Sequence, residues 1–197
     1  MVNNVTRINP KVDFAFKKLF GSEENKDILM SFINSVVSEE NKICNLELKN
    51  PYNISNYKEG KMTILDIKAT DEKGNWYHIE MQIAEQGYYD KRAFYYWAKV
   101  YSDQIERGIN FDRLKKTIGI NILDFNYLDE ENFHNVYKVY NTETKKEFCD
   151  LFEMHFIELG KLNKDYKNLK TNLERWVTFL NKGYEEKVLK VIETCIE

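Results

Sequence analysis

The sequence predicts an α/β fold in which a mixed β-sheet is flanked by helices. Apolar residues recur at helical spacing near both ends of the 197-residue chain and in its middle, whereas other segments alternate as strands do. The expected order is two helices, three strands, one helix, three strands and two helices, which favours one mixed sheet with helices on its faces. With 2 Pro, 8 Gly and no internal repeat, the chain has no obvious linker.

The composition is that of an ordinary globular protein, with 43% hydrophobic and 31% charged residues. The formal net charge of −3 weighs against a protein that only binds DNA, although it allows local basic patches. The 3 cysteines are odd in number and lack CxxC spacing, so we expect reduced thiols rather than a zinc ribbon or a disulfide framework. No apolar run resembles a signal core or reaches membrane-spanning length, so we expect a cytoplasmic protein without membrane association.

The N-terminal part is expected to form two helices and an edge strand. DFAFKKLF (13–20) has helical character and stops at Gly21, a residue that commonly follows a helix. Ser22 is the expected start of a second helix, whose apolar residues at helical spacing are Ile28, Leu29, Phe32, Ile33, Val36 and Val37. ICNLELKN (43–50) alternates briefly and is stopped by Pro51, which is typical of an edge strand.

The next segment, ILDIKATDEKGNWYHIEMQ (64–82), predicts a β-hairpin. Its turn, EKG (72–74), fits a three-residue loop with glycine in the left-handed third position. In the register set by this loop, Asp66 lies opposite Glu80 on one face of the sheet, whereas a two-residue loop would shift the pairing by one residue. Like charges whose β-carbons are about 5 Å apart destabilise a pair of strands, so something must offset the repulsion.

The second half of the chain is expected to contribute one long helix, three strands and a helical tail. The helix YYDKRAFYYWAKVYSDQIERG (88–108) ends at Gly108 and carries its apolar stripe at Phe94, Trp97, Ala98, Tyr101 and Ile105. TIGINILDF (117–125) is apolar on both faces and predicts a central strand, and the segments 136–141 and 151–159 alternate as two more. The tail stops within a helical pattern, so we expect a natural chain that continues further.

Three arrangements of Asp66 and Glu80 are compatible with the residues alone. On a solvated outer face, Lys68, Lys73 and water would screen the two charges. In the second arrangement the carboxylates share a proton, as acid/base dyads do. In the third they hold a divalent cation, since Mg²⁺ binds one or two carboxylates and keeps water in its other positions. The backbone carbonyl of Met81 would then lie close to the ion.

A family resemblance adds to this interpretation. An Asp on one strand followed by Glu-x-Gln on the next resembles the PD-(D/E)xK nuclease signature, in which a lysine usually takes the place of Gln82. More specifically, the chain resembles the PD-(D/E)xK nuclease family transposases and Rpn-type recombination-promoting nucleases of bacteria. The matching stretches follow in order and cover most of the chain: DFAFKKLFG (13–21), ILMSFINSV (28–36), LDIKATDEKGNWYHIEMQ (65–82), RAFYYWAKVYSDQIERG (92–108), IGINILDF (118–125) and HFIELGKL (155–162).

The resemblance implies a restriction-endonuclease-like fold with a C-terminal helical extension. Residues 1–162 would form the nuclease-like core, and residues 163–197 would form a C-terminal helical segment, truncated from a longer chain. It also implies Mg²⁺-dependent cleavage of DNA, with Mn²⁺ as a substitute.

The resemblance assigns the metal ligands to the hairpin. Asp66 and Glu80 match the acidic positions, Met81 adds its backbone carbonyl, and Gln82 takes the lysine position. Gln82 can orient a water molecule through hydrogen bonds but cannot supply positive charge. Lys68, on the same face, either replaces the missing lysine or only screens the charges of the two carboxylates.

Two other segments match polar positions of the family. Asp13 is assigned to a catalytic position beside the metal; its alternative is an acid favoured by the macrodipole at a helix start. Lys17 either approaches a DNA phosphate or is solvated. Arg92 is a DNA-binding candidate because a guanidinium group can bind two phosphate oxygens at once. Tyr96 and Gln104 are expected to have structural roles.

The resemblance thus predicts a metal-dependent DNA endonuclease linked to recombination or mobile elements. The alternative is a catalytically weak or inactive DNA-binding or oligomerisation module on a nuclease scaffold, with the surplus tyrosines of residues 88–101 at a partner interface. With a net charge of −3, efficient DNA binding would need a partner, a homodimer or a further C-terminal part. No P-loop or dinucleotide-binding glycine pattern is present, so no nucleotide cofactor is expected.

Overall fold

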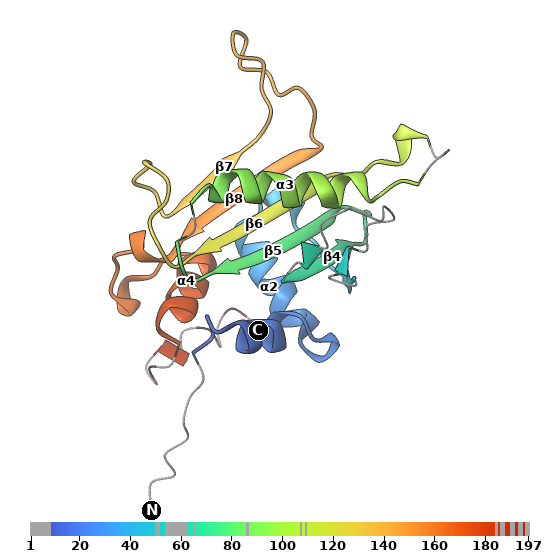
Figure 1. Cartoon of the computed structure of the whole chain (residues 1–197). Helices are drawn as coiled ribbons and strands as arrows, with labels where there is room; N and C mark the ends of the chain where they lie inside the picture. The colour runs from blue at the N-terminus through green and yellow to red at the C-terminus, as the bar shows by residue number, and fades with distance from the viewer. Residues whose placement is uncertain are drawn as a thin grey trace, which may run out of the picture.

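The computed structural model contains a mixed six-stranded sheet flanked by helices, which confirms the predicted α/β fold class (Figure 1). It describes residues 9–183 except 50, 51, 54–62, 65, 86, 107 and 109, and beyond residue 183 it describes 185, 188, 189, 192 and 195. The main sheet contains the strands β1 (Leu46–Leu48), β4 (Ile67–Asp71), β5 (Trp76–Gln82), β6 (Thr117–Leu123), β7 (His134–Tyr137) and β8 (Phe152–Glu158). Two short strands, β2 (Tyr52–Asn53) and β3 (Thr63–Ile64), form a separate pair.

The strand order of the main sheet is β1-β4-β5-β6-β8-β7. Strand β6 is central and pairs in parallel with β5 and β8, whereas the remaining ladders are antiparallel. Every residue of β6 is buried, as the apolar run on both faces predicts. Strand β1 lies at the edge of the sheet, also as predicted, while Pro51 lies outside the described residues.

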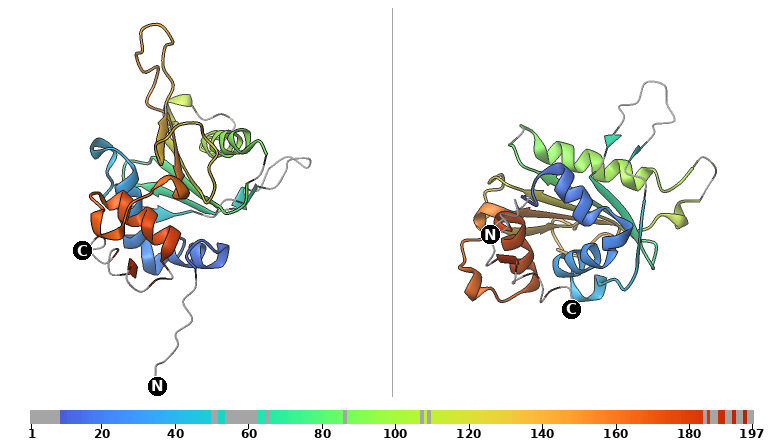
Figure 2. Two further views of the ribbon diagram at one scale, coloured as in Figure 1. Left: turned by 90° about the vertical axis from the view of Figure 1, so that its left-hand side faces the viewer. Right: turned by 90° about the horizontal axis from the view of Figure 1, so that it is seen from below.

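Helices cover both faces of the sheet. The helices are α1 (Asp13–Phe20), α2 (Lys26–Val36) and α4 (Asn172–Lys182) on one face, and α3 (Tyr89–Ser102) on the other. Figure 2 shows this arrangement, with the blue and red helices on one side of the sheet and the green α3 on the other. Short 3₁₀ turns connect these elements at Glu23–Asn25, Glu39–Asn41, Phe111–Arg113, Leu159–Lys161 and Tyr166–Asn168.

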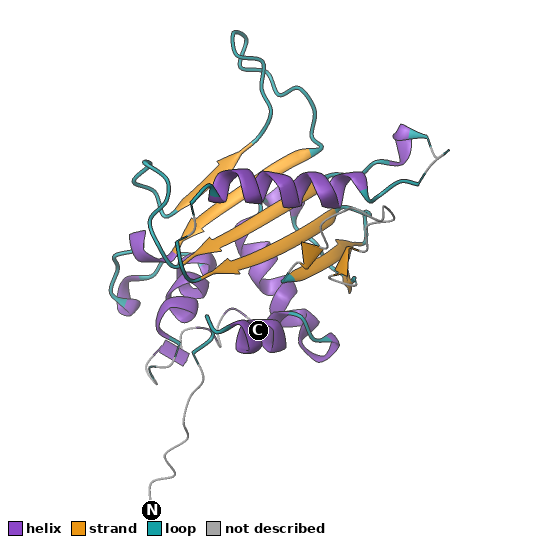
Figure 3. Cartoon of the chain, in the orientation of Figure 1, coloured by secondary structure: helices purple, strands orange, loops and turns teal. Residues whose placement is uncertain are grey.

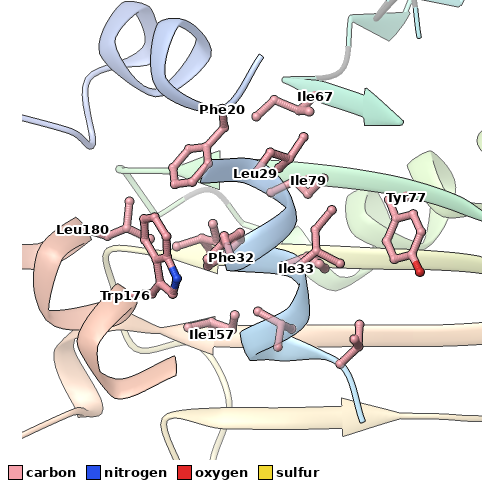
Figure 4. Close-up of a cluster of buried hydrophobic side chains, with 14 of the residues drawn as sticks. Phe20, Leu29, Phe32, Ile33, Ile67, Tyr77, Ile79, Ile157, Trp176 and Leu180 are labelled. Atoms are coloured by element: carbon pink, nitrogen blue, oxygen red, sulfur yellow. The ribbon is translucent and has the colours of Figure 1, made fainter. Parts of the chain in front are cut away.

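The larger core lies between the sheet and the three helices α1, α2 and α4 (Figure 4). Phe20, Phe32 and Trp176, one from each helix, form a ring cluster with centroids 5.3–5.8 Å apart. Burying each such side chain contributes about 1.5–3 kcal/mol, so the cluster ties the three helices together. Helix α4 starts with a capping box in which the side chains and backbone of Thr171 and Glu174 bond each other. The boundary expected after residue 162 remains a prediction.

The second core lies under α3, and here the predicted stripe was only partly right, since Trp97 is buried and Ala98 and Tyr101 pack against the core. The buried residues of α3 are Tyr89, Ala93, Trp97 and Val100, whereas Phe94 is 56% exposed. Aromatic residues occur on several sides of this helix, so their spacing alone did not identify the buried side. The helix also ends at Ser102, earlier than the predicted end at Gly108.

The hairpin of β4 and β5 has the predicted register, with Ile67 opposite Ile79. Gly74 has φ +84°, the left-handed value that the three-residue turn requires. The carboxylate of Asp71 accepts hydrogen bonds from the backbone N–H groups of Lys73 and Asn75, at 2.9 and 2.8 Å, and thereby fixes the turn. The register at the other end of the hairpin follows from this turn.

The last two predicted strands also form, with shifted bounds. Strand β7 begins at His134 and ends at Tyr137, because the chain then leaves the sheet as a long connection to β8 (Figure 3). The helical pattern predicted near the C-terminus lies mostly outside the described residues. Within the part of the chain that is described, no helix has both the length and the apolar character needed to cross a membrane.

Candidate active site

Asp66 and Glu80 lie side by side where the hairpin leaves the sheet. The backbone N–H of Asp66 donates to Oε1 of Glu80 at 3.2 Å, and the backbone N–H of Met81 donates to Oδ2 of Asp66 at 2.8 Å. Asp66 directly precedes β4, so its carboxylate takes a place in the ladder that a backbone carbonyl would otherwise occupy. The two carboxylates therefore hold fixed positions relative to each other.

The two carboxyl groups do not lie on a solvated face. Glu80 is only 7% exposed, and the side chain of Asp66 is 16% exposed. Burial, followed by the charge of Asp66, raises the pKa of Glu80 to about 8. Burial also raises the pKa of Asp66, although the hydrogen bond from Met81 and the charge of Lys17 oppose this rise. Water therefore does not offset the repulsion expected between them.

Helix α1 brings a third carboxylate and an ammonium group to this pair. Lys17 Nζ lies 2.8 Å from Oδ1 of Asp13 and 3.4 Å from Oδ1 of Asp66. The helix is held in this place by Phe16 and Phe20, both fully buried in the larger core. Asp13 and Lys17 thus lie beside the hairpin site, and Lys17 is not simply a solvated surface residue.

The last residue of β5 contacts the start of α3. The guanidinium Nη2 of Arg92 donates a short hydrogen bond to Oε1 of Gln82, whose Nε2 donates to the carbonyl of Ala84 at 2.9 Å. The guanidinium carbon also lies 4.7 Å from the ring centroid of Tyr89 and 5.9 Å from that of Tyr96. Arg92 therefore approaches the same strand end as Glu80, which lies two residues before Gln82.

Lys68 lies on the expected face of the sheet, but its ammonium group does not lie beside the carboxylates. Lys68 is buried opposite His78, and its Nζ lies 4.9 Å from the ring centroid of Trp76. Trp76 is four residues from Glu80 along β5, a distance of roughly 13 Å. The ammonium group beside the carboxylates belongs to Lys17 instead. Burial lowers the pKa of Lys68.

Gln104, expected to be structural, contacts the chain far from the carboxylates. Its side chain bonds the backbone of Lys115 and the hydroxyl of Thr117 at the start of β6, at the opposite end of the sheet from Gln82. These contacts fasten the segment that follows α3 to the central strand.

The sequence matches the family described as PD-(D/E)XK nuclease family transposase over residues 10–194. The chain belongs to this family. The match spans all the residues just described, from Asp13 to Thr117, and membership supports a nuclease-type function with DNA as the implied substrate. Comparison with curated proteins and with solved structures gave no match.

The donor set of this family member fits a hard divalent cation with few protein ligands. Among the described residues, no group of three or more His, Cys, Asp or Glu side chains is arranged to hold a metal. Asp66 and Glu80 offer carboxylate oxygens, and the carbonyl of Met81 lies on the same strand edge as its N–H, which bonds Asp66. Mg²⁺ commonly binds through one or two carboxylates and keeps water in its other positions, so these oxygen ligands are of the kind that Mg²⁺ requires.

Two residues near the site were missed by the sequence interpretation. Tyr89 packs under the guanidinium group of Arg92, and its hydroxyl donates to Oδ1 of Asn121 at 3.1 Å. Asn121 is fully buried in β6 and pairs in register with Glu80. A single amide within the apolar run TIGINIL was the signal available for Asn121, because a buried amide requires hydrogen-bond partners.

Proposed function

We propose that this protein is a metal-dependent DNA endonuclease that hydrolyses phosphodiester bonds in the cytoplasm during recombination or the movement of mobile elements. The observation that carries this proposal is the pair formed by buried Glu80 and half-buried Asp66. Two neighbouring carboxylates that are largely removed from water are costly to ionise without a cation, and their raised pKa values express that cost. Such a pair does not stabilise the fold, and its place at this strand end fits a role in binding a cation.

Asp66, Glu80 and the backbone carbonyl of Met81 would hold Mg²⁺, with Mn²⁺ as a substitute. When bound, the ion would polarise the scissile phosphate and lower the pKa of a water molecule. The site is preorganised, because hydrogen bonds from backbone N–H groups fix the positions of both carboxylates. Asp13 adds negative charge at the outer side of the site, where its side chain is mostly exposed.

In the proposed reaction, the oxygen of one water molecule bonds to the phosphorus of a DNA phosphodiester. The bond from phosphorus to one sugar oxygen breaks, and that oxygen takes up a proton, so the products are a phosphate monoester and a hydroxyl group. Lys17 and Arg92 bring positive charge to the two sides of the carboxylate pair. Both charges favour the approach of a DNA phosphate to a protein whose net charge is −3.

A DNA-binding or oligomerisation module without catalytic activity is the second candidate. The observation that favours it is Gln82, an uncharged residue at the lysine position, together with aromatic side chains of α3 that remain exposed, Phe94 and Tyr95. An inactive module of this kind would bind DNA without cleaving it.

Plasmid cleavage with Mg²⁺ or Mn²⁺ tests the proposal. Asp66→Ala and Glu80→Ala should each lower the cleavage rate by at least about 100-fold, because each removes a ligand of the ion. The exposed Asp112, on a 3₁₀ turn before β6, provides a matched control, and Asp112→Ala should cleave as the parent does. Equal nicking by the parent and both site variants would contradict the endonuclease assignment.

A further inference from the structure

In the PD-(D/E)xK signature a lysine supplies positive charge at the position of Gln82. Because Gln82 is uncharged, another group must supply that charge. Both ends of its amide are engaged, since Oε1 accepts from Arg92 and Nε2 donates to the carbonyl of Ala84. An amide held at both ends is well placed to hold a neighbouring side chain and less suited to orient a mobile water molecule. The neighbour that it holds, Arg92, carries a permanent charge.

Arg92 is held from three directions. Gln82 accepts one of its N–H groups, and its guanidinium group lies over the ring of Tyr89 at 4.7 Å and near that of Tyr96 at 5.9 Å. Tyr89 is itself fixed, because its hydroxyl bonds Asn121 and its ring packs edge-on against Phe156. The aromatic faces attract the cation, so the guanidinium group is restrained before any substrate arrives.

The position of Gln82 on β5 brings this charge to the carboxylate pair. Gln82 and Glu80 are two residues apart on one strand, so their side chains leave the same face about 7 Å from each other. A guanidinium group is planar, carries a permanent charge and can bind two oxygens of one phosphate at once.

We propose that Gln82 and Arg92 together replace the motif lysine, with Gln82 as a positioning residue and Arg92 as the catalytic cation that contacts the scissile phosphate. The two lysines considered for this role, Lys17 and Lys68, are less suitable. Lys17 already bridges two carboxylates, Asp13 and Asp66, and the ammonium group of Lys68 lies over Trp76. This inference rests on the proposed endonuclease function and identifies the positive group of that site.

Single-turnover cleavage by a set of variants tests the replacement. Arg92→Gln should lower the rate by about 100-fold, as expected for loss of a group that stabilises transition-state charge. Adding Gln82→Lys to that variant should restore at least about 10-fold, because a lysine at 82 supplies the charge directly. Gln82→Ala removes the amide that positions Arg92 but keeps the charge of Arg92, so it should lower the rate by about 10-fold. The exposed Arg113 provides the matched control Arg113→Gln, which should leave the rate unchanged.

A second measurement does not depend on metal or on cleavage. In EDTA, Arg92→Gln should weaken binding of a short DNA duplex several-fold and reduce the dependence of log K on log salt by about 1, the effect of one lost phosphate contact. Arg113→Gln should leave both quantities as in the parent. A purely structural role for Arg92 predicts a lower melting temperature but no change in this salt dependence at temperatures where the variant is folded.

The outcomes separate the inference from the function on which it rests. A parent protein that does not cleave DNA with either metal overturns the proposed function and this inference with it. A parent that cleaves, with Arg92→Gln equally active, overturns the inference alone. Loss of activity in Arg92→Gln without recovery on adding Gln82→Lys also overturns it. If Arg92→Gln does not fold, Gln82→Ala decides, because unchanged cleavage by that variant contradicts the positioning role.

Discussion

Glu80 is buried, and within the described part of the chain no Lys or Arg side chain forms an ion pair with its carboxyl group. Its Oε1 accepts a hydrogen bond from the backbone of Asp66, and the charges of Arg92 and Lys17 act on it only from a distance. Its pKa of about 8 means that the folded protein without a bound cation holds a proton there at neutral pH. The carboxyl group therefore makes the folded state less stable whenever it must ionise.

Glu80→Gln should remove this destabilisation of the folded state. The pKa of Glu80 is about 8 in the folded state and about 4.3 in an unfolded chain, so between these values the folded state binds the extra proton. The free energy of unfolding of the parent must then fall as the pH rises from about 4.5 to 8. The glutamine keeps the acceptor oxygen but never ionises. Its melting temperature should exceed that of the parent by roughly 5–10 °C at pH 8 and by little at pH 5.

Thermal melts in EDTA at pH 5, 6.5 and 8 measure this difference. Glu143→Gln, at an exposed turn position, is the matched control and should give the same small difference at every pH. A difference between Glu80→Gln and the parent that does not grow with pH would mean that Glu80 titrates near its ordinary pKa.

At this scale, the sequence predicted the carboxylate pair but not its surroundings. The pairing of Asp66 with Glu80 follows from the turn chemistry at Gly74, which fixes the register only a few residues away. The contact of Arg92 with Gln82 depends on the path of the connection from β5 to α3, for which the sequence holds no comparable rule. For the same reason, Lys68 could be assigned to a face of the sheet, but the direction of its ammonium group could not.

At the scale of elements, the ring of one residue of β5 packs over a glycine of β6. His78 is fully buried, and it pairs in register with Gly119 of β6. Among the described residues, neither ring nitrogen of His78 has a hydrogen-bond partner. Burial lowers the pKa of His78 to about 4, so the ring is neutral at pH 7. A β-carbon at position 119 would lie only 2.7 Å from Cε1 of this ring.

Gly119→Ala should therefore destabilise the protein, although alanine is favoured over glycine in a strand. The added methyl group must displace the imidazole or the backbone of β5, which costs about 1–3 kcal/mol. Urea unfolding measures the loss. In a His78→Ala background the same substitution should cost little, because the ring that it would strike is gone. Equal costs in the two backgrounds would show that the ring is not the obstacle.

Helices and strands could be predicted where the residue pattern is compatible with only one arrangement of buried side chains. The run TIGINILDF (117–125), apolar on both faces, predicts a central strand, and every residue of β6 is buried. The stripe of α3 was predicted only in part, because aromatic residues surround much of that helix. Tyr89 and Trp97 are buried by packing on the sheet, whereas Phe94 lies at the margin of the same core.

At the scale of the whole molecule, the order of elements was sufficient to predict a mixed sheet with helices on both faces. It did not determine which helix lies beside the site. Helix α1 is far from the hairpin in sequence, yet the ring cluster of Phe20, Phe32 and Trp176 holds it so that Lys17 contacts Asp66. The site therefore depends on the larger core, and any ion bound at the site should stabilise the whole fold.

Millimolar Mg²⁺ or Mn²⁺ should raise the melting temperature of the parent. An ion that binds only the folded state adds RT ln(1 + [L]/Kd), which is about 2.7 kcal/mol at a hundredfold excess over Kd. The rise should be larger at pH 8 than at pH 6, because the ion must displace the proton that Glu80 binds below pH about 8. Asp66→Asn should show no rise, whereas Asp112→Asn, with the same change at an exposed site, should behave as the parent does. An equal rise in both variants would place the ion elsewhere, and no rise in the parent would leave the buried carboxylates without their proposed cation.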